Sequence, residues 1–420
     1  MSAGRLTMSL CRSLGRAGGV LGGRVALAID PGLLAGLAGP RSVALVSGTN
    51  GKTTTTAMLA AAFRVRSRPA WNGTGANMPD GALAALLDDP EADSAVLEVD
   101  EGYLPNVIAE TRPDFVVLLN ISRDQLDRVG EVRSVVRRIR AALLASPHTT
   151  VIANAGDPLV VAAAQATPHR IWVAPPSTWR HDGVTCLLCD GHIDPAEPTW
   201  RCSGCGLTRP AADWTVSEDG LLAGPEGFCR QMRLRLPGTA NLVDAAFAVA
   251  AAAAYGVAAE QAVEAVAELD EVAGRYRSFP RTDGETRLLL AKNPAGWAET
   301  LTVLESSPGA VVIAVNAREA DGRDPSWLWD VPFERLRGRR VTASGDRAAD
   351  VAVRLAYAEV AHDVVADPVA AVRRVRGRVE VAADYTAFLA ARARLSRAAD
   401  LTLVTPGAAA ASGPPRDGTG

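Results

Sequence analysis

The sequence has few aromatic residues, no large excess of charge and no long apolar run. Phe, Trp and Tyr make up 5% of the 420 residues, while 48% are hydrophobic and 22% are charged. This is ordinary globular composition, with enough length for two or three domains. The formal net charge of -3 gives no strong positive field, so nucleic acid is not an expected partner. Even the Ala-rich run 245–254 is far shorter than the roughly 18 apolar residues of a membrane span, so no transmembrane segment is expected.

Cysteine is rare as well, and its pattern is informative. The chain has six cysteines, and four of them form two Cys-x-x-Cys pairs. Such pairs suit a metal site in a reducing compartment better than a disulfide framework, so we expect a cytoplasmic protein. The acid-free segment 1–16 has the Arg and Ser of a transit peptide, but a basic surface helix that leads into the first domain is the preferred interpretation.

Strand-like apolar runs alternate with helix-like stretches along the first half of the chain. The first run ends at a glycine turn that leads into a helical stretch to about Phe63. This alternation predicts an α/β fold with a mostly parallel sheet covered on both faces. The expected strands are 43–46, 95–99, 115–119 and 151–153, and the expected helices include 132–144 and 241–254.

A second α/β unit is expected in the last third of the chain. It begins near 288–291, continues with a strand at 311–315 and is expected to end with a strand at 401–404. The tail that follows has the composition of a disordered segment. The predicted parts are a lead-in segment 1–40, a nucleotide-binding domain 41–280 with an insertion at about 184–210, a C-terminal domain 281–405 and a disordered tail 406–420.

A phosphate-binding loop stands at the first junction of a strand and a helix. The run 47–55 reads Ser-Gly-Thr-Asn-Gly-Lys-Thr-Thr-Thr, and a glycine turn at such a junction presents consecutive backbone N–H groups to phosphate oxygens. Lys52 would meet the terminal phosphates and Thr53 would ligate magnesium. The predicted nucleotide-binding residues of the loop are Gly48, Thr49, Asn50, Gly51, Lys52, Thr53 and Thr54.

The loop departs from the generic P-loop at one position. That pattern has a glycine six residues before the lysine, and Val46 stands there instead. The match is to Gly-Thr-x-Gly-Lys-Thr followed by Thr or Ser, which is typical of Mur ligases and folylpolyglutamate synthetases. The alternative is a glycine turn capped by threonines, which the position after an apolar strand disfavours.

Carboxylates follow the apolar strand 95–97 in the segment Glu98-Val99-Asp100-Glu101. A carboxylate at the carboxyl end of a neighbouring strand is where a magnesium ion that bridges ATP phosphates finds an oxygen ligand. Glu98 is the first choice for this ligand, together with Thr53. As solvated charges these residues would be unremarkable, so the prediction depends on the phosphate loop.

The two Cys-x-x-Cys pairs predict a structural metal site. They are separated by twelve residues, and four thiolates complete the closed tetrahedral set of a structural zinc ion. Redox-active pairs or two local disulfides are the alternatives. The predicted zinc ligands are Cys186, Cys189, Cys202 and Cys205.

The order of these motifs resembles one family, the MurT-type subunit of lipid II isoglutaminyl synthase, which is related to the Mur ligases. The resemblance covers about residues 18–405. A Mur-type phosphate loop, a four-cysteine insertion and the segment Asp-Gly-Arg-Asp-x-Ser-Trp-Leu-Trp-Asp are highly specific in combination. The matching segments are 48–55, 72–77, 98–101, 120–128, 154–158, the four-cysteine insertion, 292–296 and 321–330.

The resemblance implies a Mur-ligase-type P-loop domain with an inserted zinc ribbon, followed by a Mur-ligase-like C-terminal domain. The implied activity is ATP-dependent amidation of the α-carboxylate of D-glutamate in the lipid II stem peptide to D-isoglutamine. Ammonia would come from a GatD-type glutaminase subunit in a heterodimer, and the lipid substrate would bring peripheral membrane contact. ATP, Mg²⁺ and a structural Zn²⁺ are the implied cofactors. A carboxylate must first become an acyl phosphate, and Lys52, Thr53 and Glu98 would stabilise the transferring phosphoryl group.

Two more nucleotide-binding residues follow from the resemblance. Asn241 lies in a segment that corresponds to the Gly-x-x-Asn segment near adenine in the wider ligase family, and Arg275 lies in a segment similar to Gly-Arg-x-Glu. The sequence departs from these patterns. Ala240, Asp244 and Arg277 stand where an aromatic residue, an asparagine and an acid are usual.

An aspartate in 321–330 is implied to complete the Cys-His pair of the glutaminase partner. An acid suits this role because it fixes the histidine tautomer and stabilises the imidazolium. Asp324 is the first choice as this catalytic residue, and Asp321 and Asp330 are close alternatives. In the simpler interpretation the two tryptophans belong to the core and the aspartates cap turns.

Three other functions compete with amidation. An amino-acid-adding Mur or folylpolyglutamate-type ligase would share the ATP chemistry, but ordinary Mur ligases use a carbamylated lysine, and the matching stretch 133–140 has arginines and no lysine. A zinc-ribbon nucleic-acid-binding ATPase, with Arg180, Arg201 and Arg209 on phosphates, is disfavoured by the overall charge. The intact phosphate loop argues against a scaffold that does not turn over ATP.

Overall fold

The computed structural model describes residues 18–73, 75–122, 132–176, 184–196, 199–272 and 275–403. The chain divides into two compact units, unit 1 (Met1–Tyr276) and unit 2 (Arg277–Gly420), and each is described by itself. The expected basic helix in 1–16, the expected tail 406–420, Arg180 and residues 123–128 lie outside the described residues. Within the described ranges, no helix is long and apolar enough to cross a membrane.

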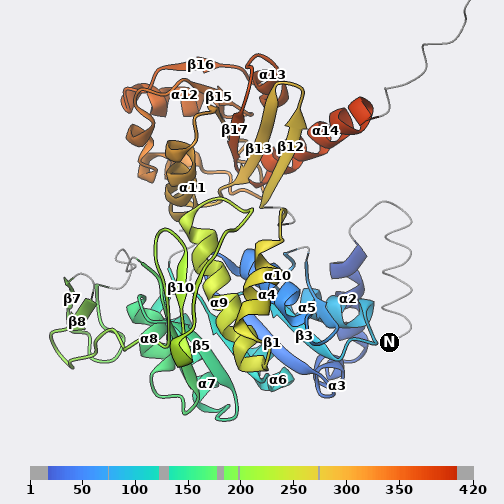
Figure 1. Cartoon of the computed structure of the whole chain (residues 1–420), viewed down its shortest axis with the longest axis vertical. Helices are drawn as coiled ribbons and strands as arrows, with labels where there is room; N and C mark the ends of the chain where they lie inside the picture. Colours follow the sequence, from blue (N-terminus) through green and yellow to red (C-terminus); the bar gives the residue numbers. More distant parts are fainter. Residues whose placement is uncertain are drawn as a thin grey trace, which may run out of the picture. The chain divides into compact units, whose positions relative to one another are not determined.

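Unit 1 is built on a nine-stranded sheet that is parallel through most of its width (Figure 1). The central strand β1 pairs in parallel with β3 on one side and β4 on the other. Only β10 runs antiparallel to both of its neighbours, β9 and β11. In sheet order the strands are β11 (Cys229–Gln231), β10 (Leu221–Ala223), β9 (Trp214–Val216), β6 (Arg170–Ala174), β5 (Thr150–Asn154), β4 (Phe115–Leu118), β1 (Ser42–Ser47), β3 (Ser94–Glu98) and β2 (Pro69–Trp71).

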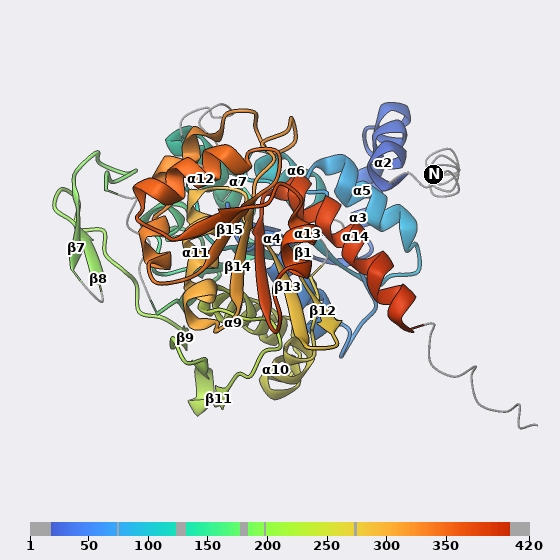
Figure 2. The ribbon, with the colours of Figure 1, turned by 90° about the horizontal axis from the view of Figure 1, so that it is seen from above.

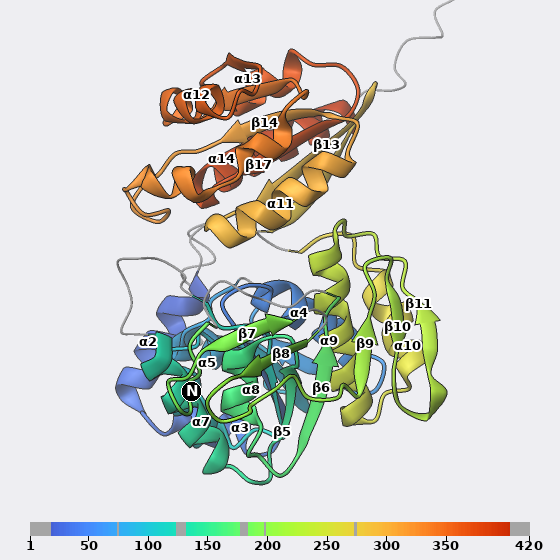
Figure 3. The same ribbon diagram turned by 90° about the vertical axis from the view of Figure 1, so that its left-hand side faces the viewer.

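Helices cover both faces of this sheet because its strands are apolar on both sides. In β1, Val43 and Leu45 face one buried cluster, while Ala44 and Val46 face the other. A strand buried on both faces is expected to be apolar at every position rather than at alternate ones. The first face carries α2 (Gly18–Ile29), α3 (Leu33–Ala38), α5 (Pro79–Asp88), α6 (Leu104–Thr111), α7 (Val132–Leu144) and α8 (Pro158–Ala164). The second carries α4 (Lys52–Phe63), α9 (Thr239–Tyr255) and α10 (Ala259–Ala267), which lie side by side (Figures 1 and 3).

The four cysteines lie in a small separate element. Strands β7 (Ile193–Ala196) and β8 (Thr199–Cys202) form an antiparallel two-stranded sheet, with one cysteine pair before the hairpin and the other at its end. In the chain this hairpin lies between β6 and β9, which are themselves neighbours in the main sheet and pair in parallel. The predicted insertion is therefore a hairpin that leaves the order of the main sheet intact.

Unit 2 contains a six-stranded sheet (Figure 2). Strand β17 pairs in parallel with β13 and β14, and the parallel pairing continues through β15 to β16. In sheet order the strands are β12 (Tyr276–Arg281), β13 (Gly284–Leu290), β17 (Val379–Ala383), β14 (Ala310–Ala314), β15 (Val341–Ser344) and β16 (His362–Val364). The helices are α11 (Pro294–Ser306), α12 (Ala348–Tyr357), α13 (Pro368–Arg373) and α14 (Tyr385–Leu403), with the 3-10 turns η2 (Pro325–Asp330) and η3 (Phe333–Leu336).

The predicted α/β fold with a mostly parallel sheet is confirmed, and one predicted element is wrong. The last strand was expected at 401–404, but residues 401–403 end the long helix α14. A short apolar run fits either structure. Here it continues a stretch rich in Ala, Arg and Leu, which favour a helix, and the last strand of the sheet is β17.

Candidate functional site

The phosphate loop follows β1 and is shaped by two glycines. Gly48 and Gly51 have φ angles of +145° and +83°, values that residues with a side chain rarely adopt. A Cβ at Gly48 would lie 2.9 Å from that of Leu119, and one at Gly51 would lie 2.4 Å from the Oδ1 atom of Asp244. Both positions therefore favour glycine for conformation, and Gly48 requires it for space as well.

The first turn of α4 has no side-chain cap. Gly51 is its N-cap residue and contributes no side-chain hydrogen bond to the turn. The first N–H groups of a helix have no acceptor within the helix, and the helix dipole favours negative charge at this end. Lys52 and Thr53 are the first two residues of α4, so the lysine lies at the helix end where the sequence predicts phosphate binding.

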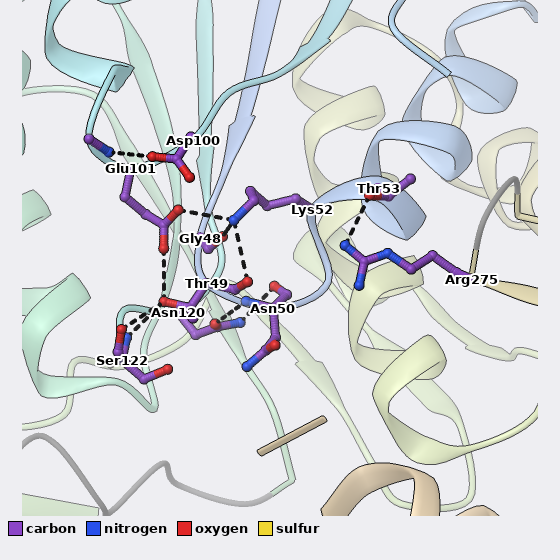
Figure 4. A network of polar contacts seen from close by, with 11 residues as sticks. Gly48, Thr49, Asn50, Lys52, Thr53, Asp100, Glu101, Asn120, Ser122 and Arg275 are labelled. Carbon is purple, nitrogen blue, oxygen red and sulfur yellow. Dashed lines mark hydrogen bonds and ion pairs between the residues drawn. The ribbon is translucent and has the colours of Figure 1, made fainter. Parts of the chain in front are cut away.

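Lys52 is buried and is surrounded by oxygen atoms (Figure 4). Its ammonium donates to the backbone carbonyls of Gly48 and Thr49 and forms an ion pair of 3.0 Å with Glu101. The Oγ1 atom of Thr49 donates to the second carboxylate oxygen of Glu101 at 2.9 Å. One carboxylate thus joins the start of the loop to the lysine.

Asn120 and Ser122, which follow β4, contact the other side of the phosphate loop. The Asn50 backbone N–H donates to Asn120 Oδ1 at 2.8 Å, and Asn120 Nδ2 donates back to the Asn50 carbonyl at 3.0 Å. The Ser122 backbone N–H donates to Thr49 Oγ1 at 2.9 Å. The residues after β1, β3 and β4 therefore form one network at the carboxyl ends of adjacent parallel strands, where open α/β sheets bind ligands.

Glu98 has the properties expected of a metal ligand. Its residue is 1% exposed, and its Oε2 atom is buried and has no hydrogen-bond partner. Asn72 holds its backbone, accepting from the Glu98 N–H at 2.7 Å and donating to the Glu98 carbonyl at 2.8 Å. An orphaned carboxylate oxygen is costly in a protein interior, and a bound magnesium ion would satisfy it. The residues therefore fit the predicted metal.

Arg275, expected near the nucleotide, does lie at the loop. Its Nη2 atom donates to Thr53 Oγ1 at 3.3 Å, and Figure 4 shows it on the side of the loop opposite Glu101. The hydroxyl predicted to ligate magnesium is thus next to a permanent cation. Thr54 is buried in the first turn of α4.

Asn241 does not take part in the hydrogen-bond network of the phosphate loop. Its Nδ2 atom donates to the Pro237 carbonyl at 2.5 Å, within its own turn at the start of α9. Asp244, one turn further along α9, is the residue of this helix that lies against the loop, because its carboxylate occupies the space beside Gly51. The substitution noted in the sequence therefore falls at the loop itself.

The four cysteines meet at one point. Their sulfur atoms all lie within 4.8 Å of one another, with Cys186 and Cys205 3.7 Å apart and Cys189 and Cys202 3.4 Å apart. Four thiolates at the ~2.3 Å distance of a tetrahedral zinc ion lie about 3.8 Å apart. The cluster could therefore hold a metal ion, and the geometry does not correspond to disulfides, whose sulfur atoms are about 2.05 Å apart.

Backbone N–H groups support thiolates in this cluster. Leu188 N donates to Cys186 Sγ and Gly204 N to Cys202 Sγ, both at 3.4 Å. Burial raises the pKa of Cys186 to about 12, whereas the backbone N–H of Cys205 lowers the pKa of Cys202 to about 6. A metal ion that binds all four sulfur atoms must displace the remaining thiol protons.

The three aspartates of 321–330 lie in different environments. Asp321 is committed to the fold of unit 2, since its carboxylate accepts from the Arg318 backbone N–H and from both the backbone N–H and the hydroxyl of Thr386. Asp324 is exposed and is the N-cap of η2, accepting from Ser326 N at 2.9 Å. Asp330, at the end of η2, is exposed as well.

Apolar side chains are exposed beside Asp330. Trp329 is 54% exposed and meets the 73% exposed ring of Tyr357 edge to face, at 5.2 Å between centroids. Val353, one turn earlier on α12, is 51% exposed. Trp327 is half-buried and stacks on the buried Trp297. One tryptophan of the segment is therefore half-buried against the core, and the other lies on the surface.

Sequence reasoning gave no role to three residues of the loop network: Glu101, Asn120 and Ser122. All three stand in segments that the sequence singles out. Their partners are 49 to 73 positions away in the chain, so only the pairing of β1 with β3 and β4 brings them together. The signal in the sequence that could have identified these three residues is their position shortly after a buried strand.

The chain matches two protein families along its length. Residues 46–177 match the family described as Mur ligase middle domain, and residues 290–388 match MurT ligase C-terminal. It is 30% identical over 380 residues to the lipid II isoglutaminyl synthase (glutamine-hydrolyzing) subunit MurT of Streptococcus pneumoniae, covering 84% of this chain and 85% of the relative. The subunit of the same name from Staphylococcus aureus is 28% identical over 388 residues, or 86% and 88% of the two chains.

Solved structures share the fold at lower identity. A pseudomurein peptide ligase type C from Methanothermus fervidus superposes with a TM-score of 0.67 at 17% identity, covering 85% of this chain and 79% of that one. The MurF ligase of Thermotoga maritima in complex with ADP gives 0.58 at 15% identity, covering 89% and 83%. These likenesses concern the fold, whereas the identity to the two subunits over most of both chains shows the family: the chain belongs to the MurT family, within the Mur ligases.

Proposed function

We propose that this chain is the ATP-dependent synthetase subunit of a lipid II isoglutaminyl synthase. It would amidate the α-carboxylate of D-glutamate in the stem peptide of lipid II, giving D-isoglutamine. In this proposal unit 1 is the ATPase domain and unit 2 the Mur-ligase-like C-terminal domain. The observation that carries the proposal is the phosphate loop with the orphaned carboxylate of Glu98 beside it, in a chain related to the MurT subunits over most of its length.

The loop residues suit phosphoryl transfer to a carboxylate. The N-terminus of α4 and the ammonium of Lys52 would hold the terminal phosphates of ATP, and Arg275 would add a second cation beside them. Thr53 and Glu98 would hold magnesium, which would neutralise negative charge on the phosphates when bound. The carboxylate attacks the γ-phosphorus and becomes an acyl phosphate while ADP leaves. Ammonia then displaces phosphate, forming the amide and releasing a proton.

The arginines of α7 support amidation over amino-acid addition. Where ordinary Mur ligases carry a carbamylated lysine, these side chains connect neighbouring elements of unit 1. Arg133 forms an ion pair with Asp190 beside the cysteines, Arg138 donates to the carbonyl of Gly102 at 3.1 Å, and Arg140 donates to the carbonyl of Ala162 at 2.6 Å. An arginine does not form that carbamate, so a relative that works without it fits this chain better.

The cysteine cluster is proposed to hold structural zinc. The four thiolates would fill all positions of a tetrahedral ion and leave none for substrate. Arg133 connects the segment of the first cysteine pair to α7, because it donates to Asp190 and to the Cys186 carbonyl. Loss of the metal should therefore disturb unit 1 locally rather than remove the chemistry.

Ammonia is proposed to come from a GatD-type glutaminase in a heterodimer with this chain, in the cytoplasm, with membrane contact only through the lipid substrate. The relatives named as MurT are each a subunit of a glutamine-hydrolysing enzyme. Asp324 is proposed to complete the partner's Cys-His pair. Its exposure supports this role, whereas Asp321 is occupied by hydrogen bonds. The exposed pair Trp329 and Tyr357 is an apolar surface on the same unit that such a partner could cover.

Mass spectrometry of a D-glutamate-containing lipid II analogue tests the proposal. The analogue is incubated with the chain, Mg-ATP and ammonium. Conversion of a hydroxyl to an amino group, strictly dependent on ATP, is the expected mass decrease. A mass increase after amino acids are added would indicate an amino-acid-adding ligase instead. No mass change with ammonium or with amino acids would contradict the proposal.

A further inference from the structure

Glu101 makes contacts that its position in the sequence does not predict. It lies in the turn after β3, and its two carboxylate oxygens contact two different groups of the phosphate loop (Figure 4). Oε2 pairs with the Lys52 ammonium at 3.0 Å, and Oε1 accepts from the Thr49 hydroxyl at 2.9 Å. Glu98 is different, because its Oε2 atom has no partner and is available to a metal. The two carboxylates therefore have separate roles.

The ion pair is shielded from water. The side chains of Lys52 and Glu101 are 6% and 14% exposed. Charge pairs in such surroundings interact more strongly than surface pairs, and removing one partner leaves the other charge buried and unpaired. The lysine that would contact phosphate is thus paired with a carboxylate of its own chain.

The turn that carries Glu101 is itself held in place. Asp100 Oδ1 accepts from the Gly102 backbone N–H at 3.0 Å, and the Asp100 N–H donates to the carbonyl of Asn77 at 2.8 Å. Arg138 of α7 donates to the Gly102 carbonyl at 3.1 Å. The backbone on both sides of Glu101 is therefore fixed by contacts with other elements, so the carboxylate is presented to the loop by the fold.

We propose that Glu101 is a positioning residue of the nucleotide site: its carboxylate holds Lys52 and Thr49 in place and remains beside them while the ammonium binds the phosphates of ATP. This inference rests on the proposed ATP-dependent function. Nucleotide phosphates and the Glu101 carboxylate then share the same ammonium, and both are negative, so the carboxylate opposes binding. The same carboxylate orients the lysine and the threonine, so the rate of phosphoryl transfer depends on it. Glu101 thus lowers affinity for ATP and raises turnover.

Glu101→Gln separates these effects. The amide has nearly the same size but no charge, and an NH2 donor replaces one of the two oxygens that accept from Lys52 and Thr49. We expect the Kd for a non-hydrolysable ATP analogue, measured by calorimetry, to fall three- to tenfold. In ammonium-driven amidation kcat should fall at least tenfold while the KM for ATP falls. Glu101→Asp keeps the charge, so its Kd should stay within twofold of wild type and kcat should be partly restored.

Glu110→Gln is the matched control. Glu110 is an exposed glutamate on α6, the helix that follows the same turn, so affinity and turnover should both be unchanged. A Glu101→Gln protein that is folded by circular dichroism but binds the ATP analogue with unchanged or weaker affinity would overturn the proposal. The calorimetric measurement does not require lipid II. A wild-type chain that binds ATP but amidates nothing would contradict the proposed function while leaving the role of Glu101 testable.

Discussion

The Nη2 atom of Arg275 donates a hydrogen bond to the hydroxyl of Thr53 at 3.3 Å. Thr53 lies in the first turn of α4, and Arg275 lies at the end of unit 1, 222 positions later in the chain. The last residues of the unit are thereby brought back to its phosphate loop. A guanidinium in this place adds a cation that cannot lose its proton.

Arg275→Ala should weaken ATP turnover. A charge-assisted hydrogen bond to phosphate is worth about 1.5–3 kcal/mol, which corresponds to a rate loss of about ten- to hundredfold. Arg275→Lys keeps the charge but not the fork of donors, so it should retain part of the rate. Phosphate release measured with saturating Mg-ATP and substrate checks this. Equal rates for the alanine variant and wild type would place Arg275 outside the nucleotide site.

Lys52→Ala should abolish ATP turnover and leave the metal content of the chain unchanged. The lysine is the buried cation of the phosphate loop, whereas the cysteines lie in a separate hairpin. Turnover is measured by ADP formation, and metal by inductively coupled plasma mass spectrometry on the same sample. Loss of both together would mean that the substitution had disrupted unit 1, and unchanged turnover would remove Lys52 from the chemistry.

The phosphate loop and its strands could be predicted because their signals are local. The apolar run of β1, the glycines and Lys52 follow one another within a few positions, so spacing alone indicates strand, turn and helix. The role of Glu101 depends on register instead. Val46 pairs with Glu98 across β1 and β3, which places the turn after β3 beside the turn after β1. A single sequence does not show which strands are neighbours, so this contact could not be predicted.

The choice among the aspartates of unit 2 also required the structure. All three stand in one motif, and each could cap a turn. The contacts of Asp321 with Thr386, 65 positions away, show that this residue holds the loop to the start of α14. The helix that ends at Leu403 was missed for a related reason, since short apolar runs are ambiguous when their tertiary neighbours are unknown.

Substitution of Cys189 by serine should release the bound metal. A serine hydroxyl does not replace a thiolate in a closed four-sulfur site, so we expect about one equivalent of zinc in wild type and a loss of most of it in the variant. Bound metal should also fall as the pH is lowered, because protons compete for the thiolates. Cys229→Ser is the control, since this exposed cysteine lies on β11, outside the cluster. Zinc retained by Cys189→Ser would contradict a four-thiolate site.

Glu334→Gln should weaken unit 2 more at neutral pH than in acid. The hydrogen bonds from Arg354 hold the pKa of Glu334 below its usual range. A carboxylate whose pKa is lowered by folding stabilises the fold above its ordinary pKa, and this contribution is lost as the pH falls through the folded-state value. Because Glu334 is partly exposed, we expect a loss below about 1 kcal/mol at pH 7 and a smaller loss at pH 3.

Hydrogen exchange of α12 amides in the full chain measures this effect in unit 2 alone. Glu319→Gln is the comparison, since Glu319 pairs with Arg323 only at the surface, where both side chains are at least 79% exposed. It should leave exchange unchanged at both pH values. A Glu334→Gln effect of the same size at pH 7 and pH 3 would show that the ion pair does not cause it.

Asp324→Asn should separate the two nitrogen sources. Asp324 is exposed, and the amide can still accept the hydrogen bond from Ser326 N that caps η2, so the fold should be retained. An amide cannot stabilise a partner's imidazolium as a carboxylate does. Ammonium-driven amidation should therefore proceed at the wild-type rate, and glutamine-driven amidation with the glutaminase subunit should fall at least a hundredfold. Equal loss with both nitrogen sources would show that Asp324 acts in the synthetase reaction or in folding.

The neighbouring aspartates provide the comparison that makes this result specific. Asp330→Asn should leave both nitrogen sources unaffected if Asp324 is the residue that reaches the partner. Asp321→Asn should lower both rates together, because the carboxylate that accepts from Arg318 and Thr386 holds the loop in unit 2. A selective loss of glutamine-driven amidation in Asp330→Asn, with Asp324→Asn unaffected, would assign the role to Asp330. The pattern across the three variants thus identifies the partner-facing acid, which no single variant could do.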